Sequence, residues 1–370
     1  MGDPPPDPAA DLIVAVHQLQ PLAARRLIGP VWDYVSGGAG DENTLRRNDA
    51  AWSQVQLAPR TLVDVSALDT SVDLLGHTHP HPIVIAPTAR HTSYHPLGER
   101  ATVTGANAAQ ALFVLSSLAG TALDDVADTA AELDQPWWFQ LYVQRDRGFT
   151  ADLVAHAVRA GAQALVLTVD TPTLGARDRD KRSNLGSPDG VAYPILADAP
   201  LQPDGVAAHR RVFNPLLSPD ITWADLDWLV DISPVPVIAK GVLRADDAER
   251  FVAAGVGGLV VSNHGARNLD TVPATVEVLP QITAAVAGRV PVLVDGGIRR
   301  GTDVAKALIL GASAVLVGRP VIWGLATYGA AGVSHVIDIL RTELEMAMAL
   351  LGAPDVAALT PDLIWHQARA

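Results

Sequence analysis

The sequence predicts an α/β fold, a (β/α)8 TIM barrel, because short apolar runs alternate with segments of helical spacing along most of the chain. Each run is bounded by Gly, Pro or polar residues and is too short for a helix, and its uninterrupted apolar character is typical of a strand buried on both faces. Eight such units within about 240 residues favour closure into a barrel over the alternative, a doubly wound open sheet. The expected strands are residues 82–89, 112–119, 137–143, 164–170, 235–241, 258–265, 290–297 and 314–320.

The segments between and around these strands complete the barrel. Residues 1–75 are interpreted as a leader and barrel cap and residues 76–370 as the barrel itself, within a single structural domain overall. A strongly periodic helix near the end of the chain is expected to close the barrel. Helical spacing is clearest at residues 150–160, 245–254, 301–310 and 333–351.

One connection is much longer than the others. The fourth and fifth strands are separated by about 65 residues, enough for an ordinary unit and an insertion. The middle of this connection, residues 177–219, is polar, rich in Gly and Pro and without clear periodicity. Because this segment follows strand four, we expect a lid loop over the carboxyl-terminal mouth of the barrel, where the active sites of such barrels lie.

Composition excludes several classes of protein. The 370 residues carry 27 Lys and Arg against 40 Asp and Glu, a formal net charge of −13, which disfavours nucleic acid as a partner because phosphate contacts need clustered cations. The absence of Cys excludes a disulfide framework, a thiolate metal site and a Cys nucleophile. The apolar fraction of 49% is ample for a large core and excludes wholesale disorder.

Neither a targeting signal nor a membrane span is expected. Residues 1–10 lack the basic and apolar regions of a secretory signal, and Pro6 stands where a myristoylation motif requires Ser or Thr. The longest charge-free stretch, residues 320–337, is punctuated by Gly, Pro and His, so it is interpreted as a loop and a buried helix. We therefore expect a soluble, cytoplasmic protein without a membrane partner.

Polar side chains collect at the carboxyl ends of the expected strands, which meet on one face of a barrel. Each of them alone has a structural interpretation, but a purely structural strand end more often carries only Gly, Asn or Ser. Together they favour a catalytic site at the mouth. The residues are Gln140, Tyr142, Thr168, Asp170, Lys240, His264, Arg267, Asp295, Arg299 and Arg319.

The last two strand ends predict a phosphate site. In barrels, the loops after strands seven and eight commonly bind phosphate through backbone N–H groups. Here one loop contains Gly296, Gly297 and Arg299, and the other contains Gly318 and Arg319. Gly permits close approach of the backbone and Arg offers a bidentate fork, so the two loops together favour an anionic ligand.

His264 and Lys240 leave two chemistries open. His264 ends strand six, near the point where Asp170 ends strand four, and a carboxylate beside an imidazole raises the imidazole pKa and orients the ring, as a general base requires. Arg177 and Arg267 would then hold a substrate carboxylate. The alternative is Lys240, at the end of strand five, as the Schiff-base lysine of an aldolase.

Longer motifs carry a resemblance to a known family. They are VWDYVSGGAGDE around Tyr34, IAPTA at 85–89, FQLYV at 139–143, LTVDTPTLGAR at 167–177, AKG at 239–241, VSNHGAR at 261–267, VDGGIRRGTDV at 294–304 and VGRP at 317–320. With these motifs the chain resembles the FMN-dependent α-hydroxy acid oxidising family, which includes glycolate oxidase, lactate oxidase and mandelate-oxidising enzymes. The resemblance covers residues 12–351, and it disfavours the aldolase because Lys240 stands where the family contacts the flavin.

The resemblance implies roles for the residues that face the substrate. His264 would take the hydroxyl proton of a 2-hydroxy acid while a hydride, or its formal equivalent, passes to flavin N5, and Asp170 would stabilise the imidazolium. Fixing the substrate carboxylate would aim the α-hydrogen at N5. The carboxylate would be clamped by Arg177 and Arg267, helped by the hydroxyls of Tyr34 and Tyr142.

The resemblance also implies FMN as the cofactor. Lys240 would lie near flavin N1 and O2, where its charge favours the reduced, anionic flavin. The other contacts would be backbone at Thr88 and Ala89, side chains of Ser116, Gln140, Thr168 and Ser262, Asp295 on the ribityl chain, and Gly297, Arg299, Gly318 and Arg319 on the phosphate.

The activity implied by the resemblance is oxidation of a 2-hydroxy acid to the 2-oxo acid, with O2 as acceptor and H2O2 as product, in a homotetramer. A dehydrogenase that reduces a quinone or cytochrome is the close alternative, disfavoured because no haem domain is expected before the barrel and residues 177–219 lack an apolar anchor. A non-catalytic flavin- or phosphate-binding barrel is the alternative from another class. The presence of all the expected catalytic and substrate-binding residues argues against this non-catalytic alternative. They are Tyr34, Tyr142, Asp170, Arg177, His264 and Arg267.

Three positions depart from the family pattern. Arg90 follows IAPTA, where the family often has Met or another neutral residue, and we interpret it as a solvated loop charge rather than one turned inward. Leu118 replaces a Trp that lines the substrate pocket of glycolate oxidases, so a mandelate-like or medium-chain substrate is expected rather than glycolate. Asn268 replaces a Gln, and the sequence offers no physical reason for it.

A histidine-rich segment suggests a metal site only at first sight. Alternation would place His77, His79 and His81 on one face of a strand. Pro80 and Pro82 disfavour a regular strand, and no carboxylate accompanies the histidines. No metal is therefore expected.

Overall fold

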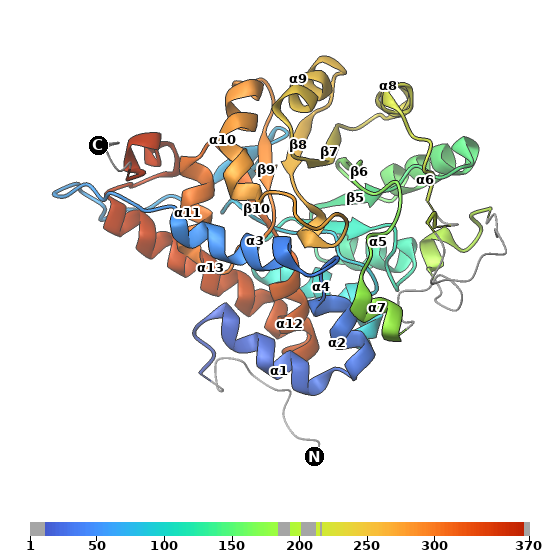
Figure 1. Ribbon diagram of the computed structural model, residues 1–370. Coiled ribbons are helices and arrows are strands. Elements are labelled where there is room, and N and C mark those ends of the chain that lie inside the picture. The colour runs from blue at the N-terminus through green and yellow to red at the C-terminus, as the bar shows by residue number, and fades with distance from the viewer. Residues whose placement is uncertain (1–11, 184–192, 201–211, 215–216, 366–370) are drawn as a thin grey trace.

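The barrel expected from the apolar runs is present in the computed structural model, which describes residues 12–183, 193–200, 212–214 and 217–365. Eight parallel strands close in the order β10-β3-β4-β5-β6-β7-β8-β9. Figure 1 shows helices packed around these strands. All eight expected strands are confirmed, and most are shorter than expected because their polar carboxyl ends turn into loops. They are β3 (Ile83–Ile85), β4 (Phe113–Ser116), β5 (Trp137–Leu141), β6 (Leu165–Thr168), β7 (Val237–Val242), β8 (Gly258–Val261), β9 (Val292–Val294) and β10 (Ala314–Val317).

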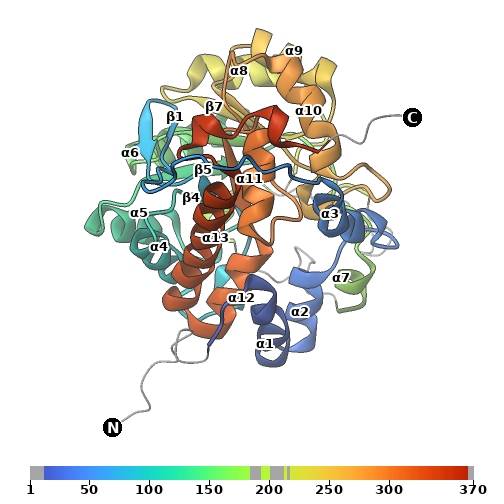
Figure 2. The same ribbon diagram turned by 90° about the vertical axis from the view of Figure 1, so that its left-hand side faces the viewer.

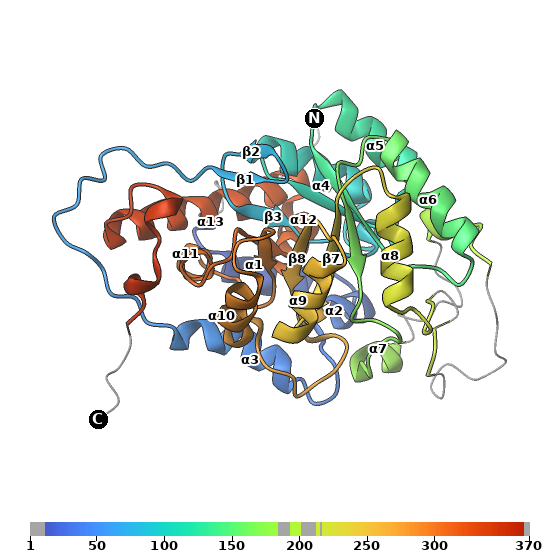
Figure 3. The same cartoon turned by 90° about the horizontal axis from the view of Figure 1, so that it is seen from above.

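Alternate residues of each strand pack into two different cores, which explains the uninterrupted apolar runs. In β3, Val84 packs inside the barrel, whereas Ile83 and Ile85 face the surrounding helices. The inner core also receives Leu74 from the antiparallel hairpin of β1 (Val72–Leu74) and β2 (His77–His79). Figure 3 shows this hairpin at one end of the barrel and the helices α3 and α7 at the other.

Helices surround the barrel, and the four expected ones are confirmed within three residues at each end. They bury apolar faces against the outer side of the strands, where the larger core lies. The surrounding helices are α4 (Gly98–Ala108), α5 (Leu123–Glu132), α6 (Arg147–Arg159), α8 (Trp223–Ile232), α9 (Ala245–Ala253), α10 (Thr275–Val286), α11 (Gly301–Ile309) and α13 (Ala330–Leu351).

The leader folds into three helices, α1 (Leu19–Arg26), α2 (Gly29–Ser36) and α3 (Asn43–Gln54). In Figures 1 and 2, α1 and α2 lie together beside α12 (Arg319–Tyr328). Helix α3 packs against α10, and α2 packs against α7 (Asp178–Ser183), so the leader reaches the mouth of the barrel. This placement brings leader residues close to strand ends that are far away in the sequence.

The interpretation of residues 320–337 as a loop and a buried helix is partly wrong, because two helices occupy this stretch. Helix α12 (Arg319–Tyr328) has Pro320 in its first turn. Gly329 ends this helix and precedes the first residue of α13. The two helices cross closely at Gly324 and Gly332, since a Cβ on Gly324 would stand 2.3 Å from the Gly332 carbonyl oxygen. None of the helices in the described part of the chain is long and apolar enough to cross a membrane.

Two further expectations need correction. The segment 177–219 begins with a regular helix, α7, and a 3-10 turn follows at Pro194–Leu196; residues 184–192, 201–211 and 215–216 of that segment lie outside the described residues. The prolines near the histidine-rich segment do not prevent a strand, because β2 forms at His77–His79. His81 lies beyond it, buried, with its Nε2 2.9 Å from the Ala109 carbonyl oxygen.

Candidate active site

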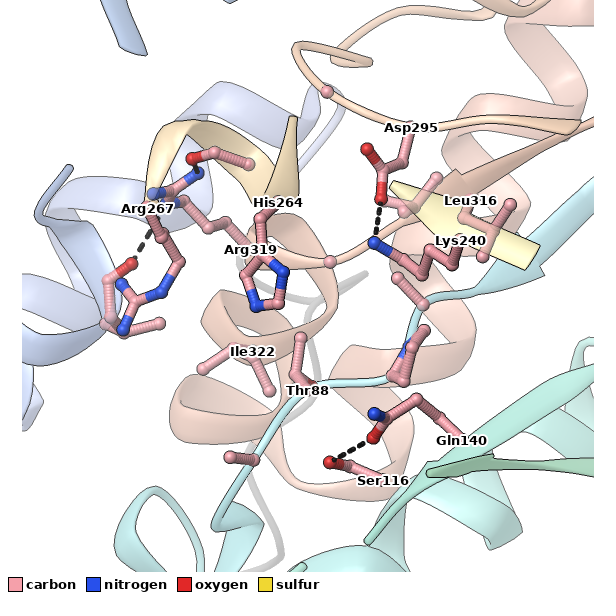
Figure 4. A pocket seen from close by; sticks show the side chains of 18 of the residues that line it. Thr88, Ser116, Gln140, Lys240, His264, Arg267, Asp295, Leu316, Arg319 and Ile322 are labelled. Atoms are coloured by element: carbon pink, nitrogen blue, oxygen red, sulfur yellow. Dashed lines mark hydrogen bonds and ion pairs between the residues drawn. The ribbon is translucent and has the colours of Figure 1, made fainter. Parts of the chain in front are cut away.

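An open cavity lies at the carboxyl ends of the barrel strands. Its volume is about 1110 Å3 including the open mouth, and its wall contains strand-end residues such as Ser116, Gln140 and Lys240. Every residue that the sequence assigned to substrate or cofactor lines this cavity except Asp170 and Ser262. These two lie directly behind the wall, because each contacts a residue that lines it. Figure 4 shows residues that line the cavity, among them Gln140, Lys240 and His264.

His264 and Asp170 form a hydrogen-bonded pair, as their positions at strand ends suggested. His264 Nδ1 lies 2.9 Å from Asp170 Oδ1, and the Thr171 hydroxyl donates to the same oxygen at 2.8 Å. Burial opposes ionisation of Asp170, but the adjacent His264 and the hydrogen bonds hold the pKa of this carboxyl below its ordinary value. An ionised Asp170 accepts from Nδ1, so the other ring nitrogen of His264 is left as an acceptor.

Two residues hold Asp170 in place. Asn268, which the sequence left unexplained, donates through its amide to the Asp170 carbonyl oxygen at 2.9 Å and to the Thr171 hydroxyl at 2.8 Å. Gly241 has φ of +113° and packs so closely that a Cβ would stand 2.5 Å from the Asp170 Cβ. The glycine of the AKG motif therefore permits the close approach of β7 to Asp170.

Arg177 and Arg267 lie together, and a residue that the sequence reasoning missed joins them. Asp180 Oδ2 is 3.2 Å from Arg177 Nη1 and 3.8 Å from Arg267 Nη2. Arg267 also donates to the backbone oxygens of Tyr34 at 2.6 Å and Gly37 at 3.2 Å. The only sequence signal for Asp180 was its position three residues after Arg177, which becomes informative once the segment is known to be helical.

The interpretation of Arg90 as a solvated charge is wrong. Its side chain is only 5% exposed, and the guanidinium lies 5.1 Å from the centre of the Tyr34 ring. Its backbone N–H donates to the Leu118 carbonyl oxygen at 3.1 Å, and its side chain hydrogen-bonds Tyr193. The side chain turns inward because aromatic and acidic groups of the leader and of the long connection meet there, which no local pattern around residue 90 reveals.

A chain of polar side chains crosses the wall between β4 and β7. Ser116 donates to the Gln140 side-chain oxygen at 3.0 Å, and the Gln140 amide donates to the Thr168 hydroxyl at 3.0 Å. Lys240 Nζ lies 2.8 Å from Asp295 Oδ2 (Figure 4). It also lies 2.8 Å from the Ser262 hydroxyl. These groups fix one another, so the wall presents donors and acceptors in defined positions.

Arg299 and Arg319 give the far end of the cavity a positive charge. Arg319 is partly buried and donates to the backbone oxygens of Val35, Gly265 and Gly37, each at 2.9 Å. Burial, with repulsion from neighbouring arginines, lowers its pKa to about 9, so it remains cationic at neutral pH. Arg299 Nη2 lies 3.1 Å from Asp49 Oδ1 at the edge of the site.

The leader supplies a further support that sequence reasoning missed. Asn48 of α3 and Asn263 exchange side-chain hydrogen bonds of 2.9 and 2.8 Å, which ties the leader to the segment that carries His264. A Cβ on Gly297, whose φ is +82°, would stand 2.0 Å from the Asn48 carbonyl oxygen. The glycine in this loop is therefore required by the packing of α3 as well as by any ligand.

The described residues fit an elongated anion with a polar planar end and a hydroxylated stem, as in FMN. Asp295 Oδ1 is buried and has no hydrogen-bond partner among the described residues, so it offers an acceptor to a ligand hydroxyl. Two partly buried cations, Arg299 and Arg319, stand at the end where the phosphate was expected. The amide and hydroxyl groups of Gln140, Ser116 and Thr168 line the opposite part of the cavity.

The chain is similar to known proteins in sequence and in fold. The FMN-dependent dehydrogenase family matches residues 23–366. The chain is 47% identical to a peroxisomal (S)-2-hydroxy-acid oxidase, GLO4, of Oryza sativa subsp. japonica, over 95% of each chain, and 46% identical to an L-lactate oxidase of a Nostoc species, over 92% of this chain and 94% of the relative. A crystal structure of mandelate oxidase with benzoyl-formic acid matches with a TM-score of 0.84 and 38% identity, covering 94% of this chain and 97% of that one.

Proposed function

Because the chain belongs to the FMN-dependent dehydrogenase family and is an FMN-dependent 2-hydroxy-acid oxidase, we propose that it converts a 2-hydroxy acid larger than glycolate to the 2-oxo acid. O2 is the electron acceptor in this proposal, and each turnover gives one 2-oxo acid and one H2O2. The observation that carries the proposal is the His264–Asp170 pair, whose imidazole lines the same cavity as Arg177 and Arg267.

The arginines bind and orient the substrate. Arg177 and Arg267 hold the carboxylate, since a guanidinium fork suits a carboxylate and both groups line the cavity. Burial raises the pKa of the Tyr142 hydroxyl, so this group stays protonated and donates a hydrogen bond to the same carboxylate, as does the hydroxyl of Tyr34. Fixing the carboxylate fixes the direction of the α-hydrogen, which is catalysis by orientation.

His264 moves the proton. Its free ring nitrogen accepts the hydroxyl proton of the substrate, and the Asp170 carboxylate stabilises the resulting imidazolium through the 2.9 Å hydrogen bond to Nδ1. FMN, when bound, supplies the acceptor for the two electrons and the hydrogen of the α-carbon. Thr171 and Asn268 keep Asp170 oriented, so the imidazole stays in the tautomer that a base requires.

The groups that hold FMN lie on the other side of the cavity. Lys240, fixed by Asp295 and Ser262, places a positive charge beside the electron-accepting part of the cofactor. The remaining contacts that we propose are backbone at Thr88 and Ala89, side chains of Ser116, Gln140 and Thr168, Asp295 on the ribityl chain, and Gly297, Arg299, Gly318 and Arg319 on the phosphate.

The choice of substrate follows from Leu118. This residue lines the cavity and is aliphatic, which leaves room for a longer or aromatic side chain on the substrate. The proposal therefore favours mandelate-like or medium-chain acids. A homotetramer in the cytoplasm completes it; the rice relative is named peroxisomal, so cell fractionation and light scattering of the purified protein test these two points.

A visible spectrum tests the function. The purified protein is expected to be yellow with FMN, to bleach anaerobically with 2-hydroxyoctanoate or mandelate, and to regain its colour in air with one H2O2 for each substrate oxidised. A protein that cannot take up FMN overturns the proposal. Fast reduction with slow recovery in air would instead identify a dehydrogenase, and a clear preference for glycolate over lactate, 2-hydroxyoctanoate and mandelate would refute the substrate class.

A further inference from the structure

A buried polar cluster that the mechanism does not use lies behind the cavity wall. Its centre is His91, which is 0% exposed and begins a short 3-10 helix after β3. The imidazole joins Thr88, which lines the cavity (Figure 4), to Thr102 of α4. His91 Nε2 lies 2.5 Å from the Thr88 hydroxyl oxygen, and Nδ1 lies 2.8 Å from the Thr102 hydroxyl oxygen. The ring therefore connects a residue of the site to a helix outside the barrel.

Glu99 of α4 holds the backbone at His91. This carboxylate is 1% exposed and accepts a hydrogen bond from the His91 backbone N–H at 2.9 Å. It also accepts from the Gly120 N–H at 2.8 Å and from the Thr121 hydroxyl at 2.6 Å, both in the loop after β4. The cluster thus ties the loops after β3 and β4 to the same helix, and each of its hydrogen bonds limits the movement of the others.

One arrangement of hydrogens satisfies the buried groups around the ring. Burial lowers the pKa of the His91 imidazole despite the nearby Glu99 carboxylate, so the ring is neutral, with one N–H donor and one acceptor nitrogen. Thr102 is 0% exposed, and among the described residues its hydroxyl contacts only Nδ1, so it donates its proton there. Nε2 then carries the hydrogen and donates it to the Thr88 hydroxyl. Thr88, at the cavity, keeps its own proton for a ligand.

We propose that His91 is a positioning residue for the cofactor, because it holds Thr88 so that the hydroxyl of Thr88 donates a hydrogen bond to bound FMN. The inference rests on the proposed function, which assigns FMN contacts to the backbone at Thr88, and it adds the side chain to them. A Cβ on Gly318 would stand 3.5 Å from Thr88 Cγ2, so this side chain lies beside a loop that is itself proposed to hold FMN. His91 acts only through Thr88, since it lies behind the residues that line the cavity.

A purely structural role for His91 is what the test must separate from this one. The imidazole lies beside Tyr94 and Phe113, with ring centroids 6.3 and 6.5 Å apart, so its loss also removes packing. Lost packing would add to the effect of a substitution at Thr88. Lost orientation of Thr88 would not add to it, because the two substitutions would then remove the same hydrogen bond to FMN.

The experiment measures the dissociation constant of FMN from the loaded protein, by the recovery of free-flavin fluorescence on dilution. Thr88→Val and His91→Leu should each raise this constant about tenfold, a change that one hydrogen bond can supply. The double variant should also bind FMN about tenfold more weakly, rather than about a hundredfold. His91→Gln, whose amide offers a donor and an acceptor, should return the constant to within about threefold of the wild-type value.

Thr121→Val is the matched control within the same cluster. It removes a hydroxyl that donates to Glu99, so thermal stability should fall while the FMN dissociation constant stays within about twofold of the wild-type value. Equal weakening of FMN binding in Thr121→Val and His91→Leu overturns the inference, because any damage to the cluster would then suffice. Additive losses in the double variant overturn it too, as does a His91→Gln variant as weak as His91→Leu.

These outcomes leave the proposed function intact, because the His264–Asp170 pair is unchanged in every variant. If His91→Leu does not fold, Thr88→Val decides, since wild-type affinity for FMN in that variant overturns the inference. A wild-type protein that takes up no FMN overturns the proposed function and the inference together.

Discussion

The two halves of the cavity are built in different ways. On the proposed cofactor side, Gln140 and Lys240 belong to barrel strands, and their partners Ser116 and Asp295 are also at strand ends. On the proposed substrate side, Tyr34 comes from α2 of the leader, and Arg177 and Asp180 come from the connection after β6. The barrel fixes the first half directly, whereas the second depends on segments that pack onto the barrel from outside.

This difference assigns separate tasks to the two halves. A closed parallel barrel holds strand-end groups rigidly, which suits a cofactor that every turnover uses again. Groups on a leader and a long connection can change without disturbing the barrel, which suits recognition of one substrate among many. Substitutions in the two halves should therefore affect different measurements.

The largest effect is expected where the two halves meet, at His264. In His264→Ala the proton acceptor is lost, and the rate of flavin bleaching by substrate should fall about a thousandfold, within the range typical of a general base. FMN content should not change, because His264 is not among the proposed cofactor contacts. Stopped-flow absorbance under anaerobic conditions measures the rate. Bleaching within tenfold of the wild-type rate would contradict the assignment of the base.

Lys240→Met tests the cofactor half. The substitution leaves Asp295 buried without its 2.8 Å ion pair, which should lower the free energy of unfolding by about 3 kcal/mol and weaken FMN retention. Thermal unfolding and the ratio of flavin to protein absorbance measure the two effects. The double variant Lys240→Met with Asp295→Asn removes both charges and should recover most of the stability. If Lys240→Met alone is as stable as the wild type, the ion pair between Lys240 and Asp295 does not stabilise the strand ends.

Asp180→Asn tests the substrate half. The variant loses the ion pairs that orient Arg177 and Arg267, so KM should rise about fivefold, corresponding to roughly 1 kcal/mol, with a smaller change in kcat. Asp180→Glu keeps the charge and should recover part of the loss. FMN retention should be that of the wild type, in contrast to Lys240→Met. Loss of FMN in Asp180→Asn would show that the two halves are not separable.

The pH dependence sharpens this prediction. Burial raises the pKa of the Asp180 carboxyl above its ordinary value, despite the nearby arginines. The wild-type protein should therefore lose this negative charge at a higher pH than an exposed Asp would, and should come to resemble the Asn variant. We expect the difference in KM between the two proteins to shrink as the pH falls, and to do so at a higher pH than the ordinary pKa of an Asp would give. A difference that persists until the pH reaches that ordinary pKa would contradict the raised pKa of Asp180.

The same division separates what the sequence could predict from what it could not. The eight strands and the residues at their ends were predictable, because the hydrophobic period and the position at a strand end are read from the local sequence. Closure of the barrel then brings the strand ends together in space. The burial of Arg90, the bridging position of Asp180 and the Asn48–Asn263 pair were not, because each depends on how the leader or the long connection packs. The helix α12 was missed for another reason, since Gly324 serves close packing and Pro320 stands in the first turn, so neither residue marks a loop.

Asn268 offers the finest test, because it follows β8 and supports Asp170, which follows β6. In Asn268→Ala the Asp170 carbonyl oxygen and the Thr171 hydroxyl each lose one hydrogen bond, so Asp170 should orient His264 less well. A loss of about 1 kcal/mol corresponds to a roughly fivefold lower rate of flavin bleaching, with KM and FMN content close to wild type. Asn268→Asp, which retains only acceptor oxygens, should lower the rate at least as far. If KM rises in either variant while the rate is unchanged, Asn268 serves the substrate clamp instead of the His264–Asp170 pair.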